Sequence, residues 1–140
     1  MRVLGVDFGM TRIGLAVGES EVKISSARTS ILASKNLKKD AFAIVELARK
    51  ESCDLIAIGF PEAENPLDDG KMQRICRLLA EKISEKGVKA ILIDESLTTV
   101  EAEASLRDAG LSASTIRKYK DGRSAQIILE RFFEGGFENL

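Results

Sequence analysis

The first thirty residues alternate short apolar runs with turns and predict three consecutive strands. Residues 3–8 and 13–17 are apolar runs separated by a turn at Gly9, which is typical of a β-hairpin. Residues 22–32, VKISSARTSIL, alternate apolar and polar positions only in part. Their polar content predicts a third antiparallel strand toward the edge of a sheet.

The middle of the chain changes to helical spacing. Apolar residues recur at the period of an amphipathic helix over residues 38–52 and 71–86. Residues 54–60 and 90–93 are instead unbroken apolar runs, DLIAIGF and AILI, which are typical of strands covered on both faces. An acidic loop with one proline, residues 62–69, lies between the first of these strands and the second helix.

The C-terminal part of the chain predicts two more helices. A capping-box pattern opens a helix over residues 98–109, and a glycine ends it. Residues 111–120 are polar and basic, so we expect a loop or a partly ordered turn there. The last helix is expected over residues 121–133, where apolar side chains again recur at helical spacing.

This order of elements, β-β-β-α-β-α-β-α-α, predicts an α/β fold with a mixed five-stranded sheet in the order 3-2-1-4-5 and helices on both faces. A chain of 140 residues is expected to form one domain, residues 1–140. No apolar run approaches the ~20 residues that cross a bilayer, and no cleavable signal stands at the N-terminus. We therefore expect a cytoplasmic protein without membrane association.

The composition restricts the chemistry. The chain has no histidine, which excludes Ser-His-Asp and Cys-His catalysis, HExxH zinc sites and histidine general bases. Its two cysteines, Cys53 and Cys76, lack CxxC spacing, and we interpret them as buried structural thiols. The net charge of −1 gives no general attraction to nucleic acid. Any such binding must come from a local patch or from a metal.

Carboxylates stand at three places that the predicted fold brings near one another. Asp7 lies inside the first strand, where a carboxylate must be paired or bind metal; a salt bridge with Arg12 is the structural alternative. Asp94 and Glu95 follow the fifth strand, at the carboxyl ends where α/β sheets collect ligands. Asp121 opens the predicted last helix, where it is otherwise an N-cap. Such acids without histidine favour Mg²⁺ or Mn²⁺ and phosphodiester cleavage.

The densest basic cluster of the chain surrounds the last of these acids. Its members are Arg117, Lys118, Lys120 and Arg123. A basic segment beside an acid cluster suits the capture of a nucleic-acid backbone next to a metal site. The alternative is that these four charges only solvate a surface loop.

Three separated blocks resemble a bacterial protein family, the YqgF/RuvX type. They read VLGVDFGMTRIGLAVG at the N-terminus, ILIDESLTTVEAE in the middle and KDGRSAQIILERFFEGG near the C-terminus. The family has an RNase H-like fold. Its members are described as Holliday junction resolvases and as pre-16S rRNA processing nucleases in ribosome biogenesis.

The resemblance implies a cytoplasmic, Mg²⁺- or Mn²⁺-dependent endonuclease with one catalytic, metal-binding acid from each block. These acids are Asp7, Glu95 with Asp94 beside it, and Asp121. Arg12 matches the basic residue of the hairpin turn and joins the basic cluster as a nucleic-acid contact. The implied substrate is precursor rRNA or a four-way DNA junction. Cutting a junction on both strands requires a symmetric pair of sites, and therefore a homodimer.

Two departures from the family pattern keep alternatives open. Ser96 replaces the usual arginine after Asp-Glu, and the 62–69 loop carries added negative charge. Both are compatible with a non-catalytic nucleic-acid-binding domain of the same fold. The hairpin also resembles the phosphate-binding Asp-x-Gly hairpin of actin, sugar kinases and chaperone ATPases. Those enzymes close a cleft between two lobes, whereas 140 residues accommodate one.

Overall fold

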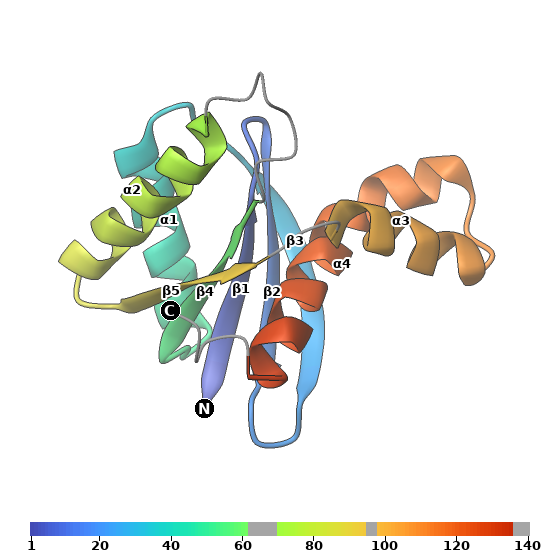
Figure 1. The fold of residues 1–140 in the computed structure, drawn as a ribbon, viewed down its shortest axis with the longest axis horizontal. Helices are drawn as coiled ribbons and strands as arrows, with labels where there is room; N and C mark the ends of the chain where they lie inside the picture. Colours follow the sequence, from blue (N-terminus) through green and yellow to red (C-terminus); the bar gives the residue numbers. More distant parts are fainter. Residues whose placement is uncertain (62–69, 95–97, 136–140) are drawn as a thin grey trace.

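A five-stranded mixed sheet forms the centre of the molecule (Figure 1). The computed structural model describes residues 1–61, 70–94 and 98–135. The strands run in the order β3-β2-β1-β4-β5, which confirms the predicted topology. The first three strands pair antiparallel, whereas β4 lies parallel to β1 and β5 parallel to β4. Their bounds are β1 Arg2–Phe8, β2 Arg12–Glu19, β3 Ile24–Leu32, β4 Leu55–Phe60 and β5 Lys89–Asp94.

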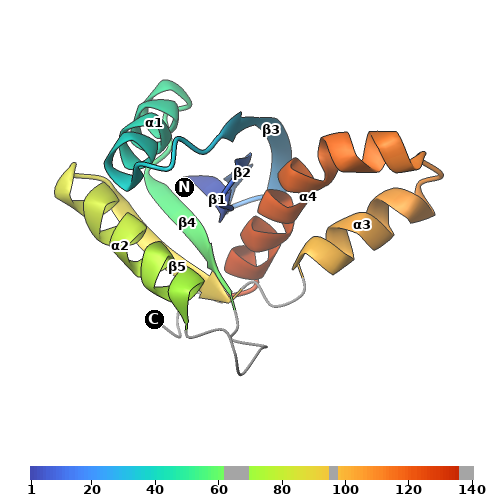
Figure 2. The same cartoon turned by 90° about the horizontal axis from the view of Figure 1, so that it is seen from above.

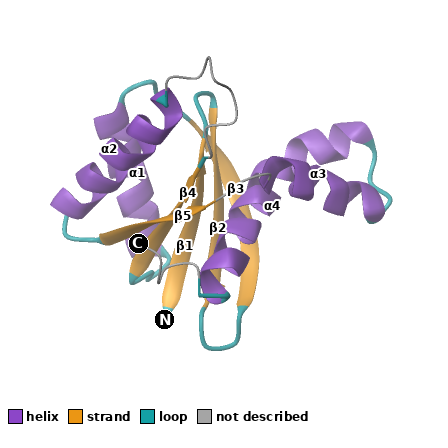
Figure 3. Cartoon of the chain, in the orientation of Figure 1, coloured by secondary structure: helices purple, strands orange, loops and turns teal. Residues whose placement is uncertain are grey.

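Helices cover both faces of the sheet, as predicted (Figures 2 and 3). Helices α1 (Leu37–Lys50) and α2 (Lys71–Glu85) lie together on one face. Helix α4 (Ala113–Phe133) crosses the other face, and α3 (Thr98–Asp108) packs against α4. None of the helices in the described part of the chain combines the length and apolar character that a membrane span requires.

Strand alternation divides the core into two layers and thereby decides where Asp7 points. In β1, Leu4 and Val6 pack into the core under α1 and α2, whereas Val3 packs into the core under α4. Successive side chains of a strand point to opposite faces. Asp7 has the parity of Val3 and Gly5, so its side chain faces α4.

The prediction of a loop for residues 111–120 was wrong, because residues 113–120 form the first part of α4. The helix begins after Ser112, whose side chain accepts a hydrogen bond from the backbone amide of Thr115, and continues without interruption to Phe133. The segment reads as a loop because it lacks an apolar stripe for the sheet. Its first turns extend beyond the sheet and lie beside α3 instead (Figure 1).

The two cysteines differ in burial. Cys76 is buried in α2, as predicted, whereas Cys53 is only partly buried after α1. Burial raises the pKa of the Cys53 thiol to about 11. Because the thiolate is the nucleophilic form, this cysteine is unreactive near neutral pH, in agreement with a structural role.

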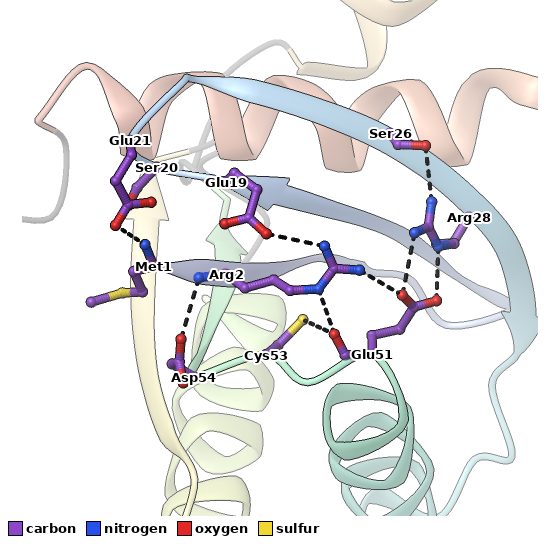
Figure 4. A network of polar contacts seen from close by, with 10 residues as sticks. All are labelled: Met1, Arg2, Glu19, Ser20, Glu21, Ser26, Arg28, Glu51, Cys53 and Asp54. Carbon is purple, nitrogen blue, oxygen red and sulfur yellow. Dashed lines mark hydrogen bonds and ion pairs between the residues drawn. The ribbon is translucent and has the colours of Figure 1, made fainter.

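A network of polar contacts ties the start of β1 to β3 and to the end of α1 (Figure 4). The carboxylate of Glu51 receives Arg2 Nη2 at 3.0 Å and Arg28 Nε at 2.9 Å. Arg2 also reaches Glu19 Oε1 on β2 at 3.1 Å. Hydrogen bonds from Arg28, then those from Arg2, hold the pKa of Glu51 below its ordinary value.

Glu51 is therefore expected to make the free energy of unfolding decrease at acidic pH. Its pKa is lower in the folded than in the unfolded chain, so its contribution is present above the ordinary carboxyl pKa and is lost as the pH falls through the lowered one. In Glu51→Gln, the urea midpoint should be lower at pH 7 and fall less between pH 7 and pH 3 than in wild type. Equal slopes of the two pH profiles would contradict this assignment.

Candidate functional site

Asp7 and Asp121 come together through a glycine. Asp7 on β1 pairs directly with Gly14 on β2, and opposed residues of antiparallel strands have Cα atoms ~4.5–5.5 Å apart. A Cβ on Gly14 would lie 2.2 Å from the backbone oxygen of Asp121. The absence of a side chain at Gly14 therefore lets α4 rest on the hairpin at Asp121. The structure brings two of the three predicted acids to one place.

Asp121 carries a buried oxygen without a partner. Oδ2 of this residue has almost no solvent contact, and no hydrogen-bond donor among the described residues reaches it. The residue lies in the middle of α4, so its prediction as the opening residue or N-cap of a helix was wrong. A buried carboxylate oxygen without a donor is costly. An oxygen left open in this way, beside a second carboxylate, fits a site for a hard cation.

The third predicted acid, Glu95, lies outside the described residues. Both sides of its segment are held by Arg131 of α4, which donates to the backbone oxygen of Asp94 at 3.1 Å and to Glu101 Oε1 at 2.6 Å. Arg131 thus anchors the end of β5 and the start of α3 to the helix that carries Asp121.

Asp94 occupies the opposite face of the sheet from Asp7. It pairs with Phe60 on β4, and Phe60 packs against the core under α1 and α2. The side chain of Asp94 is also exposed. Among the described residues, no three carboxylate or cysteine side chains gather closely enough to hold a metal ion. Asp7 and Asp121 are therefore the described part of the candidate site.

A single groove unites the five predicted nucleic-acid contacts. Its volume is about 790 Å³, and it runs between β3 and the helices α3 and α4. Its floor is formed at Gly122, where an added Cβ would lie 2.9 Å from Cβ of Ala27. We call it the basic groove; its basic lining residues are Arg12, Arg28, Arg117, Lys118, Lys120 and Arg123.

The cations of the basic groove fall into two groups: those that pair with a carboxylate of the described residues, and those that do not. Lys120 lies 4.0 Å from Glu103, and Arg123 lies 2.9 Å from Glu130, so these two already have carboxylate partners. Arg28 belongs to the Glu51 network. No carboxylate of the described residues pairs with the other three, which are Arg12, Arg117 and Lys118. The second group is the one whose charge is open to a phosphate backbone.

Several residues of the site were not identified from the sequence. Gly14 and Gly122 allow α4 to lie directly on the sheet, and Arg131 positions the ends of two elements. Tyr119 lines the basic groove with its side chain half exposed. A weak signal existed for Tyr119, because it is the one tyrosine of the chain and stands among four basic residues. The roles of the glycines and of Arg131 depend on contacts that no local pattern reveals.

Comparison with known sequences identifies the family. A family model described as "RuvX: Holliday junction resolvase" matches residues 1–135. A protein of Methylobacillus flagellatus named "Putative pre-16S rRNA nuclease" is 33% identical over 134 residues, which cover 95% of this chain and 90% of that protein. A protein of Anaeromyxobacter sp. (strain K) with the same name is 35% identical, covering 96% and 97%.

Solved structures agree in fold. Thermus thermophilus RuvC in complex with a Holliday junction substrate superposes with a TM-score of 0.60 at 14% identity, covering 96% of this chain and 94% of that one. Fowlpox virus resolvase, solved with Holliday junction DNA, gives 0.57 at 9% identity, covering 96% and 98%. At these identities the likeness shows the RNase H-like fold alone. On the family model and the curated relatives together, this chain belongs to the RuvX family of phosphodiester-cleaving nucleases.

Proposed function

We propose that this protein is a divalent-metal-dependent endonuclease acting on structured nucleic acid, with Asp7, Glu95 and Asp121 as its catalytic, metal-binding acids. The observation that carries the proposal is the unpartnered, buried Oδ2 of Asp121 beside the strand position of Asp7. Structural Asp residues in a core have donors, whereas this oxygen has none among the described residues. Glu95 enters the proposal from its place in the sequence, directly after β5.

The cation that fits these oxygen ligands is Mg²⁺ or Mn²⁺. Bound there, it supplies polarisation of the phosphate and activation of a water. The protein itself contributes the positions of the acids. The hairpin fixes Asp7, α4 fixes Asp121, and Arg131 anchors the backbone just before Glu95.

The basic groove holds the substrate beside these acids. Arg12 lines the groove and stands on β2 two residues before Gly14, the position that contacts Asp121. Arg12, Arg117 and Lys118 neutralise backbone phosphates, since no described carboxylate competes for them. Lys120 and Arg123 connect α4 to α3 through Glu103 and Ser105, and Arg123 also pairs with Glu130 on α4 itself.

The substrate that the comparisons favour is precursor 16S rRNA, because the curated relatives at 33% and 35% identity carry that name. A four-way DNA junction is the second candidate, from the description of the family model. The two differ in the assembly they require. Junction resolution needs a homodimer with paired sites, whereas cleavage of one RNA strand needs only a monomer.

The test joins cleavage to metal-linked stability. With Mg²⁺ or Mn²⁺ the wild type should cut precursor 16S rRNA, and its Tm should rise, because a ligand at a hundredfold excess over its Kd stabilises by ~2.7 kcal/mol. Asp121→Asn should show no such rise. Without metal it should be at least as stable as wild type, because a buried carboxylate with an unpartnered oxygen has been neutralised. Thermal scans with and without a chelator measure both effects.

Asp108→Asn, at the end of α3, is the matched control and should keep both the metal-induced rise and cleavage. A metal-induced rise of equal size in Asp121→Asn would contradict the assignment of this residue. Cleavage of a four-way junction but not of precursor RNA, by a protein that sediments as a dimer, would replace RNA by DNA as the substrate.

A further inference from the structure

The basic groove contains an aromatic ring, which has no role in neutralising the phosphates of a bound nucleic acid. Tyr119 lines the groove, and 51% of its surface is exposed. Lys118 Nζ lies 5.3 Å from the centre of its ring. The combination of an exposed aromatic ring with a cationic groove is the one that binds unpaired nucleic-acid bases by stacking.

The ring belongs to the face of α4 that fronts the groove. Tyr119, Arg123 and Gln126 follow one another at helical spacings of four and three residues, and all three line the groove. Gln126 Nε2 donates to the backbone oxygen of Ser25 at 3.2 Å, which ties this end of the helix face to β3. Lys120 and Gly122, the two neighbours of Asp121 in the sequence, also line the groove, which places the groove beside that acid.

We propose that Tyr119 is a stacking platform for an unpaired base, so that the basic groove binds a single-stranded segment of the nucleic acid beside the cleavage site. The inference rests on the proposed nuclease function and names the form of substrate that its groove accepts. Arg117 and Lys118 then contact the phosphates on either side of the stacked base. Both are without a carboxylate partner among the described residues.

Two features favour a single strand over a duplex. In a duplex each base is stacked on its neighbours, whereas an unpaired base offers its face to an aromatic ring. The groove is also small. Its volume of about 790 Å³ lies within the ~300–1,000 Å³ typical of small-ligand pockets, which suits extruded nucleotides better than the side of a double helix.

The composition provides a direct readout. The chain has one tyrosine and no tryptophan, so the intrinsic fluorescence of the protein arises from Tyr119. Stacking of a base on the ring should quench it. The protein is titrated without divalent metal, to prevent cleavage, with an unpaired oligouridine and with a blunt RNA duplex of equal length. We expect saturable quenching by the oligouridine and little by the duplex.

Substitutions separate stacking from charge. Tyr119→Ala should weaken binding of a labelled oligouridine by about 5- to 150-fold, the range that corresponds to one lost stacked base. Tyr119→Phe keeps the ring and should bind like wild type. The matched control is Phe42→Ala on α1. Phe42 is 57% exposed and has Lys86 Nζ 5.6 Å from its ring centre, but it lies outside the groove. This variant should bind unchanged.

Equal quenching by duplex and single strand, or unchanged affinity of Tyr119→Ala, would overturn the stacking role. Because the titration needs neither metal nor cleavage, its result is separate from the nuclease assay. If Tyr119→Ala bound weakly but variants of Asp7 and Asp121 cleaved like wild type, the stacking role would stand. Only the proposed nuclease mechanism would then be refuted. An oligothymidine arm distinguishes the two chemical sources of an unpaired base, and preference for oligouridine supports an RNA substrate.

Discussion

Asp7→Asn is expected to reduce metal-dependent cleavage by more than about a hundredfold while leaving the fold intact. Loss of an outer-shell partner of a metal ligand typically costs ~10–100-fold, so loss of a ligand itself should cost more. The asparagine has nearly the same shape, which preserves the pairing of Asp7 with Gly14. The metal-free Tm should therefore stay close to that of wild type.

The measurement is a single-turnover cleavage assay of precursor 16S rRNA in Mg²⁺ and in Mn²⁺, together with thermal unfolding of the same preparations. Asp54→Asn is the matched control. Asp54 stands just before β4, at the opposite end of the sheet from Asp7, and accepts a hydrogen bond from the backbone of Arg2. It should cleave like wild type. Wild-type cleavage by Asp7→Asn would remove this residue from the mechanism.

The fold followed from the sequence because its signals were local. Turn residues, unbroken apolar runs and helical spacing gave the five strands in the right order, with bounds within one or two residues for most elements. The exception was residues 111–120. The start of α4 lies between α3 and solvent and does not pack on the sheet. It therefore has no row of apolar residues at helical spacing from which a helix could be predicted.

The candidate site was only partly accessible to the same reasoning. Asp7 and Asp121 stood out as a costly acid and as the centre of a basic cluster, and the structure places them together. Asp121 was nevertheless assigned to a helix start, because the preceding turns of α4 were missed. The pairing of Lys120 with Glu103 depends on the tertiary contact between α4 and α3, which a count of charges along the chain does not reveal. The pairing of Arg123 with Glu130 lies within α4, two helical turns apart.

Gly14 carries no functional group, but because of its tertiary contact with Asp121 we expect its substitution to affect cleavage strongly. An alanine there would place its Cβ 2.2 Å from the oxygen and 2.8 Å from the carbonyl carbon of Asp121. Both are backbone atoms, so α4 itself must move away from the hairpin. Overpacking of this kind typically costs ~1–3 kcal/mol of stability. Displacement of a catalytic group by ~1 Å can cost ~10²-fold in rate.

Gly14→Ala is therefore expected to lose about a hundredfold in cleavage per folded molecule, although every acid is retained. Urea unfolding gives the folded fraction, and single-turnover cleavage gives the rate. Gly18→Ala is the matched control on the same strand and face. Its new Cβ would meet Phe133 Cζ at 2.6 Å, the far end of a side chain, and the backbone oxygen of Ile24 at 3.0 Å. Neither contact involves Asp121, so this variant should lower stability without lowering the rate. If Gly14→Ala, like Gly18→Ala, lost stability but kept the wild-type cleavage rate, the prediction would be contradicted. The distance between Asp7 and Asp121 would then not control the rate.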